Sequence, residues 1–231
     1  MPPYIFKLFS FDHIISLIAI IFLFITFLRY NEKIGIMNDS KTFLITLSVL
    51  MIFLDLSEDI VRVFTGHYSI IKDLPLQLCS IGVYLAAYNL IYRNQTIFNL
   101  IFYWGFVGAT NAILTPDGDL FELRIFFFYS QAYHAALIFA VLWMMIKYDM
   151  RMDYKSIFQV VLYTNAIVGI ITFINIVLDS NYMFLRQIPN SVSPFLMGEW
   201  PVYILMVQVF SVILVVLFIR LQDFFMKPIK Y

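Results

Sequence analysis

Seven long apolar stretches divide the chain, and polar or proline-containing segments separate them. A membrane-spanning helix needs about 20 mostly apolar residues at a rise of about 1.5 Å per residue, and each stretch comes close to that length. Every proline falls at or outside a boundary, where it disturbs a helix least. The pattern therefore predicts an all-α bundle of seven transmembrane helices, at residues 11–30, 41–64, 74–92, 96–114, 123–146, 155–178 and 200–221.

Basic residues are divided unevenly between the two sides of the predicted bundle. The loops and ends on one side carry ten lysines and arginines, and those on the other side carry five. Because cytoplasmic loops hold the excess of basic residues, this division predicts an outer N-terminus and an inner C-terminus. No small-residue cleavage site follows the first stretch, so we expect a retained transmembrane helix there. The longest connection, residues 179–199, then lies outside and is predicted to be a re-entrant or lid-like loop.

Polar side chains inside the apolar stretches gather in the outer half of the predicted bundle. The second helix carries four of them on one face of its last turns, because they are spaced three or four residues apart: Asp55, Glu58, Asp59 and Arg62. The third helix places Gln77 and Cys79 near its start, at nearly the same depth. Other predicted helices add His13, Asn111, Gln131 and His134. Since polar groups are costly in hydrocarbon, this arrangement predicts a cavity open to the outer leaflet.

Composition supports a membrane protein and narrows its partners. Apolar residues make up 62% of the chain and charged residues 13%, and the mean hydropathy is +0.86, whereas a soluble domain is about 45–50% apolar. The formal charge is zero, so the clustered basic charge of a nucleic-acid-binding protein is absent. We therefore expect residues 1–231 to form a single transmembrane domain, in a multi-pass protein of the cell membrane. The oligomeric state is not predicted.

The single cysteine, Cys79, limits the chemistry that the chain can carry. It cannot form an intramolecular disulfide, and it rules out a cysteine-rich metal site. We predict no metal and no cofactor.

Each candidate residue also has an interpretation that involves no substrate. Glu58 or Asp59 could pair with Arg62, four or three residues further along the helix, although that pair does not account for all three acids. His134 could be a buried histidine that donates to a neighbouring carbonyl. Cys79 could be a small buried residue explained by its packing. The residues alone leave these alternatives open.

Three segments resemble a known family: LPLQLCSIGVYLAAYNLIYRNQTIFNLIFYWGFVGATNAILTPD, FFFYSQAYHAALIFAVLW and NYMFLRQIPNSVSPFLMGEWPVYIL. They resemble the YwaF family of bacterial integral membrane proteins. That family is similar in turn to the eukaryotic transmembrane protein 164 acyltransferases, and more distantly to the androgen-induced-gene lipid hydrolases. The resemblance implies acyl transfer between phospholipids through an intramembrane cysteine and histidine, which fall here on Cys79 and His134. Bacterial relatives commonly read LPLHLC, and this chain has Gln77 in place of that histidine.

The resemblance therefore favours an enzyme that acts on a membrane phospholipid or lysophospholipid. Cys79 is the predicted nucleophile, His134 its general base, and Asp55 or Glu58 the group that orients the base. Gln77, Asn111 and Gln131 are the predicted hydrogen-bond donors to the reacting carbonyl, with Arg62 and His13 in support. One alternative is a lipid-binding or transport protein without covalent chemistry. Another is a structural or signalling partner in the membrane.

Overall fold

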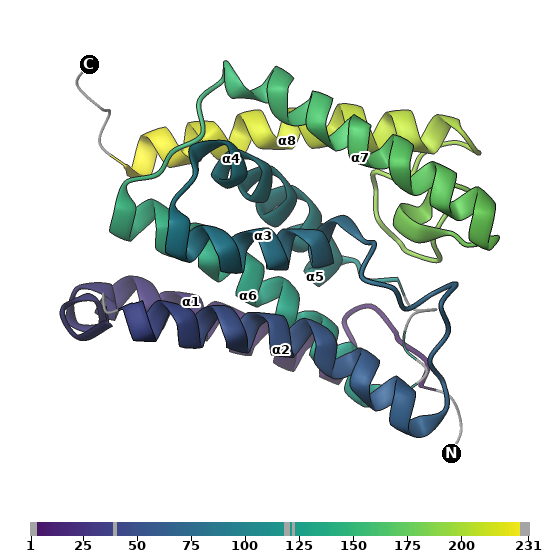
Figure 1. Ribbon diagram of the computed structural model, residues 1–231, viewed down its shortest axis with the longest axis horizontal. Helices are drawn as coiled ribbons and strands as arrows, with labels where there is room; N and C mark the ends of the chain where they lie inside the picture. The colour runs from purple at the N-terminus through teal and green to yellow at the C-terminus, as the bar shows by residue number, and fades with distance from the viewer. Residues whose placement is uncertain (1–3, 39–40, 118–120, 122, 227–231) are drawn as a thin grey trace.

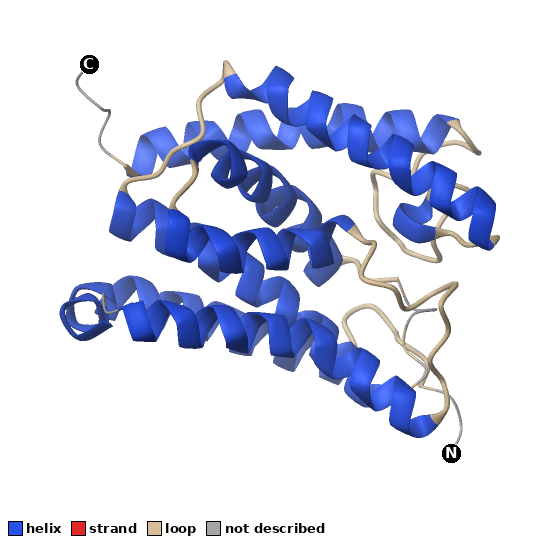
Figure 2. Cartoon of the chain, viewed as in Figure 1, coloured by secondary structure: helices blue, strands red, loops and turns tan. Residues whose placement is uncertain are grey.

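The computed structural model describes residues 4–38, 41–117, 121 and 123–226, and it describes no side chains for residues 31–38. Within these residues every regular element is a helix, so the predicted all-α fold is confirmed (Figure 2). The helices are α1 Phe11–Asn38, α2 Lys41–Thr65, α3 Leu78–Tyr92, α4 Gln95–Tyr103, the π-helix η1 Trp104–Ala109, α5 Thr110–Leu114, α6 Arg124–Tyr148, α7 Ser156–Leu178, the 3-10 helix η3 Tyr182–Phe184 and α8 Val202–Phe225.

Five of these segments are long and apolar enough to cross a membrane: the first part of α1, the continuous helix Gln95–Leu114, α6, α7 and α8. The two other predicted spans differ from them. Helix α2 has 25 residues, but any 18 consecutive residues in it include at least three charged side chains. Helix α3 has only 15 residues.

Helix α3 is short because it begins at Leu78 and not at the predicted residue 74. The backbone N–H of Leu74 donates to the hydroxyl of Tyr182 at 3.0 Å, and the N–H of Leu76 donates to the carbonyl of Leu74 at 2.7 Å. These bonds hold residues 74–77 in a turn. Consequently Cys79 is the second residue of its helix and lies in the first turn.

The helix Gln95–Leu114 contains a feature that its apolar pattern did not predict, the π-helix η1. Such segments are rare and often lie at functional sites. The glycines near it allow close packing on α6. A methyl group on Gly105 would lie 3.2 Å from Val141 Cγ2, and one on Gly82 of α3 would lie 3.2 Å from Leu137 Cδ2. The helices α3, α4, η1, α5 and α6 therefore form a tightly packed centre.

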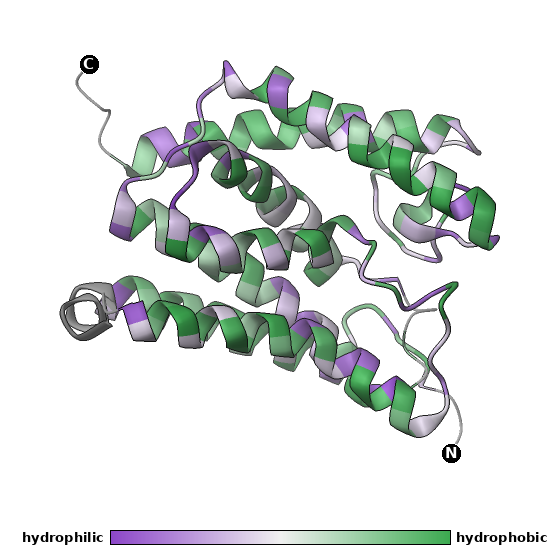
Figure 3. Cartoon of the chain, viewed as in Figure 1, coloured by the Kyte–Doolittle hydropathy of each residue, from purple (hydrophilic) through white to green (hydrophobic). Residues whose placement is uncertain are grey.

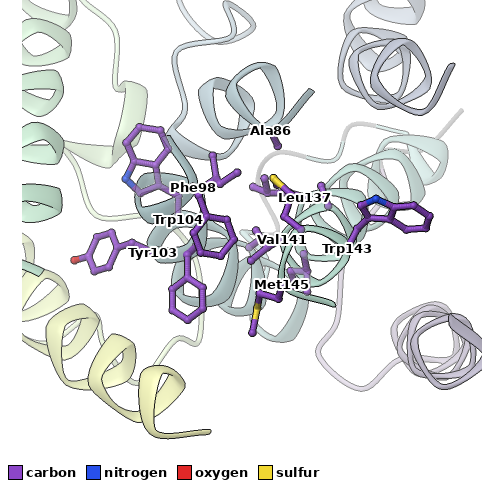
Figure 4. Close-up of a cluster of buried hydrophobic side chains, with 14 of the residues drawn as sticks. Ala86, Phe98, Tyr103, Trp104, Leu137, Val141, Trp143 and Met145 are labelled. Atoms are coloured by element: carbon purple, nitrogen blue, oxygen red, sulfur yellow. The ribbon is translucent and has the colours of Figure 1, made fainter. Parts of the chain in front are cut away.

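Peripheral helices flank this centre, with α1 and α2 on one side and α7 and α8 on the other (Figure 1). In the core, Tyr103 and Trp104 point toward α7 and α8, whereas Trp143 points toward α1 (Figure 4). Trp104 Nε1 donates to Thr164 Oγ1 of α7 at 3.1 Å, and Trp143 stacks on Phe27 of α1. Aromatic side chains thus join the centre to both flanks.

One end of the bundle, which we call the cavity end, gathers the segments that matter for the site. Helices α2, α5 and α7 end there, and α3, α6 and α8 begin there (Figure 1). Hydropathy marks the same end, since hydrophilic residues are concentrated in the last turns of α2 while α7 and α8 are mainly apolar (Figure 3). Lys227 and Lys230, which contribute to the predicted orientation, lie outside the described residues.

Candidate active site

A cavity of about 350 Å³ lies between the central helices and the flanking pair α7 and α8. Its volume falls at the lower end of the range for small-molecule sites, about 300–1,000 Å³. Four of the nine predicted site residues line it: Gln77, Cys79, Asn111 and His134. The structure therefore brings the predicted nucleophile and the predicted base, which are more than 50 positions apart in the chain, to one cavity.

Cys79 occupies the first turn of α3, beside the backbone of η1. A methyl group on Gly108 would lie 3.5 Å from Cys79 Sγ, so the missing side chain keeps that approach to the sulfur open. At a helix start the first backbone N–H groups have no partner within the helix, and their partial positive charge favours an anion such as a thiolate. Gln77, the N-cap residue, makes no side-chain capping bond.

His134 presents one ring nitrogen that is occupied and one that can act as a base. Its Nδ1 lies 2.7 Å from the carbonyl oxygen of Ser130, one helical turn earlier in α6. A carbonyl only accepts, so Nδ1 carries the proton and Nε2 carries the lone pair. The side chain is 5% exposed and lines the cavity. The hydrogen bond from Nδ1 to the Ser130 carbonyl therefore leaves Nε2 as the nitrogen that can accept a proton.

Two amide side chains have orientations that the structure fixes. Gln77 Oε1 accepts from the backbone N–H of Met183 at 2.9 Å. Asn111 Oδ1 accepts from Ser193 Oγ at 3.0 Å and lies 3.1 Å from Thr115 Oγ1. Because both carbonyl oxygens are bound in this way, the –NH₂ groups of these cavity-lining amides remain as donors.

Residues 182–196, which we call the roof segment, cover the cavity end. Hydrogen bonds tie this segment to the helices below and to α8. Ser191 Oγ donates to the carbonyl of Thr115 at 2.7 Å, and Trp200 Nε1 donates to the carbonyl of Leu185 at 2.9 Å. Tyr203 Oη donates to the carbonyl of Phe184. The long connection thus covers the cavity, as a lid-like loop does.

Tyr182 anchors the start of the roof segment. Asn175 Oδ1 accepts from its backbone N–H at 2.7 Å, and Asn175 Nδ2 donates to its carbonyl at 2.9 Å. The Tyr182 hydroxyl donates to the carbonyl of Ile70 at 2.5 Å and accepts from Leu74 N–H. Burial raises the pKa of this hydroxyl, which keeps it protonated as a donor. The pattern of apolar residues gives no signal for the contacts of the hydroxyl, because Ile70 and Leu74 lie more than 100 residues before Tyr182.

The acids of α2 lie outside the cavity lining. Arg62 Nη2 pairs with Glu58 Oε1 at 2.9 Å, and its Nε lies 3.6 Å from Asp73 Oδ1. The guanidinium also lies 4.3 Å from the centre of the Phe126 ring. The interpretation of Glu58 and Arg62 as an ion pair is thereby confirmed. Asp55 is 7% exposed and does not line the cavity either.

His13 and Gln131 also lie outside the lining and meet at the carbonyl of Ile113. His13 Nε2 donates to that oxygen at 3.0 Å, and Gln131 Nε2 donates to it at 3.4 Å. His13 Nδ1 accepts from the backbone N–H of Phe9, so both of its ring nitrogens are used. His13 therefore joins the start of α1 to the end of α5.

Several cavity residues were not singled out in the sequence. Ser130 and Tyr133 belong to the same face of α6 as His134, and a helical projection from His134 could have found Ser130. Tyr103, Asn165 and Ser211 line the part of the cavity furthest from the roof segment. Among the described side chains, no group of three or more His, Cys, Asp and Glu is placed to hold a metal ion.

Comparison with known proteins identifies one family. The model of the TMEM164 family matches residues 8–219. No curated protein and no solved structure matches the chain.

Proposed function

Because this chain belongs to the TMEM164 family and is a multi-pass membrane protein, we propose that it is a phospholipid acyltransferase or acyl hydrolase that works through Cys79 and His134. The observation that carries the proposal is the shared cavity: both side chains line it. The resemblance of three segments to the YwaF proteins and the eukaryotic acyltransferases supports the same chemistry.

The first half-reaction transfers an acyl chain from the lipid to Cys79. His134 Nε2 accepts the thiol proton, and the thiolate sulfur attacks the ester carbonyl carbon of a phospholipid. The tetrahedral intermediate collapses, and the carbon–oxygen ester bond breaks. The departing lysophospholipid oxygen takes the proton from His134, which leaves an acyl thioester on Cys79.

The second half-reaction restores the cysteine. A hydroxyl group of a lysophospholipid attacks the thioester carbonyl while His134 Nε2 accepts its proton. The carbon–sulfur bond breaks, the proton passes to the sulfur, and a new ester is released. With water as the nucleophile, the product is a free fatty acid and the protein acts as a hydrolase.

The negative charge on the carbonyl oxygen in each tetrahedral intermediate needs hydrogen-bond donors. The –NH₂ groups of Gln77 and Asn111 are the side-chain candidates, since their oxygens are bound elsewhere. The backbone N–H groups in the first turn of α3 are the main-chain candidates. In this role Gln77 is a donor and a roof contact, which accounts for a glutamine where bacterial relatives have a histidine.

We place this chemistry in the outer leaflet. The proposed topology has seven crossings in a single domain, with the N-terminus outside, because α2 and α3 lie beside the five apolar spans and basic residues are concentrated on the opposite side. The cavity end then faces outward, where the ester groups of phospholipids lie just below their headgroups. Arg62 of α2 pairs with Glu58 of its own helix and with Asp73 of the loop that precedes α3, and the role of this group is support.

Incubation of the purified protein with phospholipid vesicles tests the proposal. We expect transfer of a labelled acyl chain to an added lysophospholipid, and a covalent acyl mass on Cys79 that hydroxylamine removes. Cys79→Ala should abolish both, and Cys79→Ser is the matched control for size. Undiminished transfer by Cys79→Ala would exclude this nucleophile. Lipid binding by the wild-type protein with neither transfer nor thioester would favour the lipid-binding alternative.

A further inference from the structure

The cavity extends beyond the atoms that the proposed reaction uses. On α8 its lining runs from Tyr203 at the roof segment to Ser211, a distance of about 12 Å at 1.5 Å per residue. On the central helix it runs from Thr115 inward to Tyr103, past Gly108 beside the sulfur. Val107, Val161 and Val207 lie in the walls of the space on the inner side of Cys79, together with the polar side chains of Thr164, Asn165 and Gln208.

The lining of this space ends inward at two residues. Tyr103 of α4 and Ser211 of α8 are the innermost lining residues of their helices, at the end opposite the roof segment. Beside this end Trp104 Nε1 of η1 donates to Thr164 Oγ1 of α7 at 3.1 Å. Tyr103 is 6% exposed, and its ring points toward the flanking helices (Figure 4). Tyr103 and Ser211 thus form a floor.

The side of the same space reaches the surface of the bundle. Asn165 of α7 both lines the cavity and is exposed, so the cavity lies next to the surface of the bundle at this residue. The residues around it on the outer faces of α7 and α8 are apolar and exposed, among them Leu162, Leu205 and Val209. The roof segment, in contrast, is fastened by several hydrogen bonds. An apolar chain can therefore enter from the bilayer between α7 and α8 without breaking the roof contacts.

We propose that the space between Cys79 and the floor, the acyl slot, binds one fatty acyl chain of a membrane lipid, and that Tyr103 and Ser211 set the longest chain it accepts. The assignment of the chain as the transferred group rests on the proposed function. The carbonyl end then lies at Cys79 and His134, and the methyl end lies against the floor. The cavity lining does not continue inward past Tyr103 on α4 or Ser211 on α8, so these residues limit the length of the slot.

Three variants test the slot by changing its length. Ser211→Leu fills the inner end and should shift the bound lipids toward shorter chains. Tyr103→Leu removes the ring and should shift them toward longer chains. Ser211→Ala removes the hydroxyl with little change in volume, and it is the matched control. The shift in the ratio of short to long chains should be about tenfold, the low end of what one methylene group contributes in an apolar pocket.

The measurement is native mass spectrometry of lipid retained by full-length protein, after incubation with vesicles of phosphatidylcholines that carry decanoyl, myristoyl, palmitoyl or oleoyl chains. All variants are prepared in a Cys79→Ala background, so the result does not depend on catalysis. The proposal is overturned if folded Ser211→Leu retains the same chain distribution as Ser211→Ala, or if no acyl lipid is retained. A shifted distribution together with an unacylated wild-type Cys79 would support the slot and contradict the reaction. Acyl transfer by the wild-type protein, together with an unchanged chain distribution in Ser211→Leu, would support the reaction and contradict the slot.

Discussion

Gln77 accepts a hydrogen bond from the backbone N–H of Met183 at 2.9 Å, and this bond joins the residue before the Cys79 helix to the roof segment. The two residues are 106 positions apart in the chain. Gln77 therefore fixes the position of the roof segment relative to the cysteine.

Replacement of Gln77 by alanine should loosen the roof segment. We expect a loss of about 1 kcal/mol in the free energy of unfolding, typical of one hydrogen bond, and faster alkylation of the thiol by a maleimide. Since Cys79 is the only cysteine, the labelling rate reports on this site alone. Gln159→Ala, on the exposed surface of α7, is the control. Equal labelling rates in the two variants would show that the roof contact does not limit access.

His134→Ala should lower acyl transfer by about 10²–10⁴-fold, the usual contribution of a general base. Ser130→Ala is the informative companion, because His134 Nδ1 binds the backbone carbonyl of Ser130, which the substitution retains. We expect Ser130→Ala to keep most of the activity. Initial rates of transfer from labelled phospholipid measure both effects. Full activity in His134→Ala would remove this residue from the mechanism.

Arg62→Met should destabilise the fold strongly. The side chain is 5% exposed, and its removal leaves Glu58 and Asp73 without their cation. Breaking a buried pair on one side typically costs about 3–5 kcal/mol. Arg186→Met breaks an exposed pair with Asp179, and a change of no more than about 1 kcal/mol is expected there. Thermal unfolding in detergent compares the two variants, and equal melting temperatures would contradict the importance of the Arg62 cluster.

Gly108→Ala should fold and yet protect the cysteine. The new methyl group would lie 3.5 Å from Cys79 Sγ, an ordinary contact distance, so it covers the sulfur without a clash. We expect slower maleimide labelling and slower acyl transfer. Gly169→Ala, where no atom lies within 4 Å of the added methyl group, should change neither rate. Similar rates in the two variants would mean that η1 does not control approach to the thiol.

The helices were predictable from the sequence because long apolar runs have one stable outcome in a bilayer. Their ends were less predictable where distant residues decide them. Leu74 is apolar and adjoins an apolar run, but its N–H binds Tyr182, and α3 therefore begins later. The π-helix was also missed, since WGFVGA has the same apolar character as its neighbours.

Part of the candidate site was also predictable from the sequence. Depth along each helix follows from counting residues, and it placed Cys79, His134 and Asn111 in the outer half of the bundle. The direction of a side chain around its helix depends on which helix packs against it. Glu58 and Arg62 share the predicted depth but face Asp73 and Phe126, on a different side from the cavity.

The cavity has two unlike walls. Cys79 and His134 belong to the central helices, whose neighbours are other helices, whereas α7 and α8 present exposed apolar side chains such as Ile170, Phe173 and Leu205 to their surroundings. Lateral pressure and bilayer thickness act directly on the second wall and only indirectly on the first. We therefore expect a change in lipid packing to affect the wall formed by α7 and α8 more than the wall that carries Cys79 and His134.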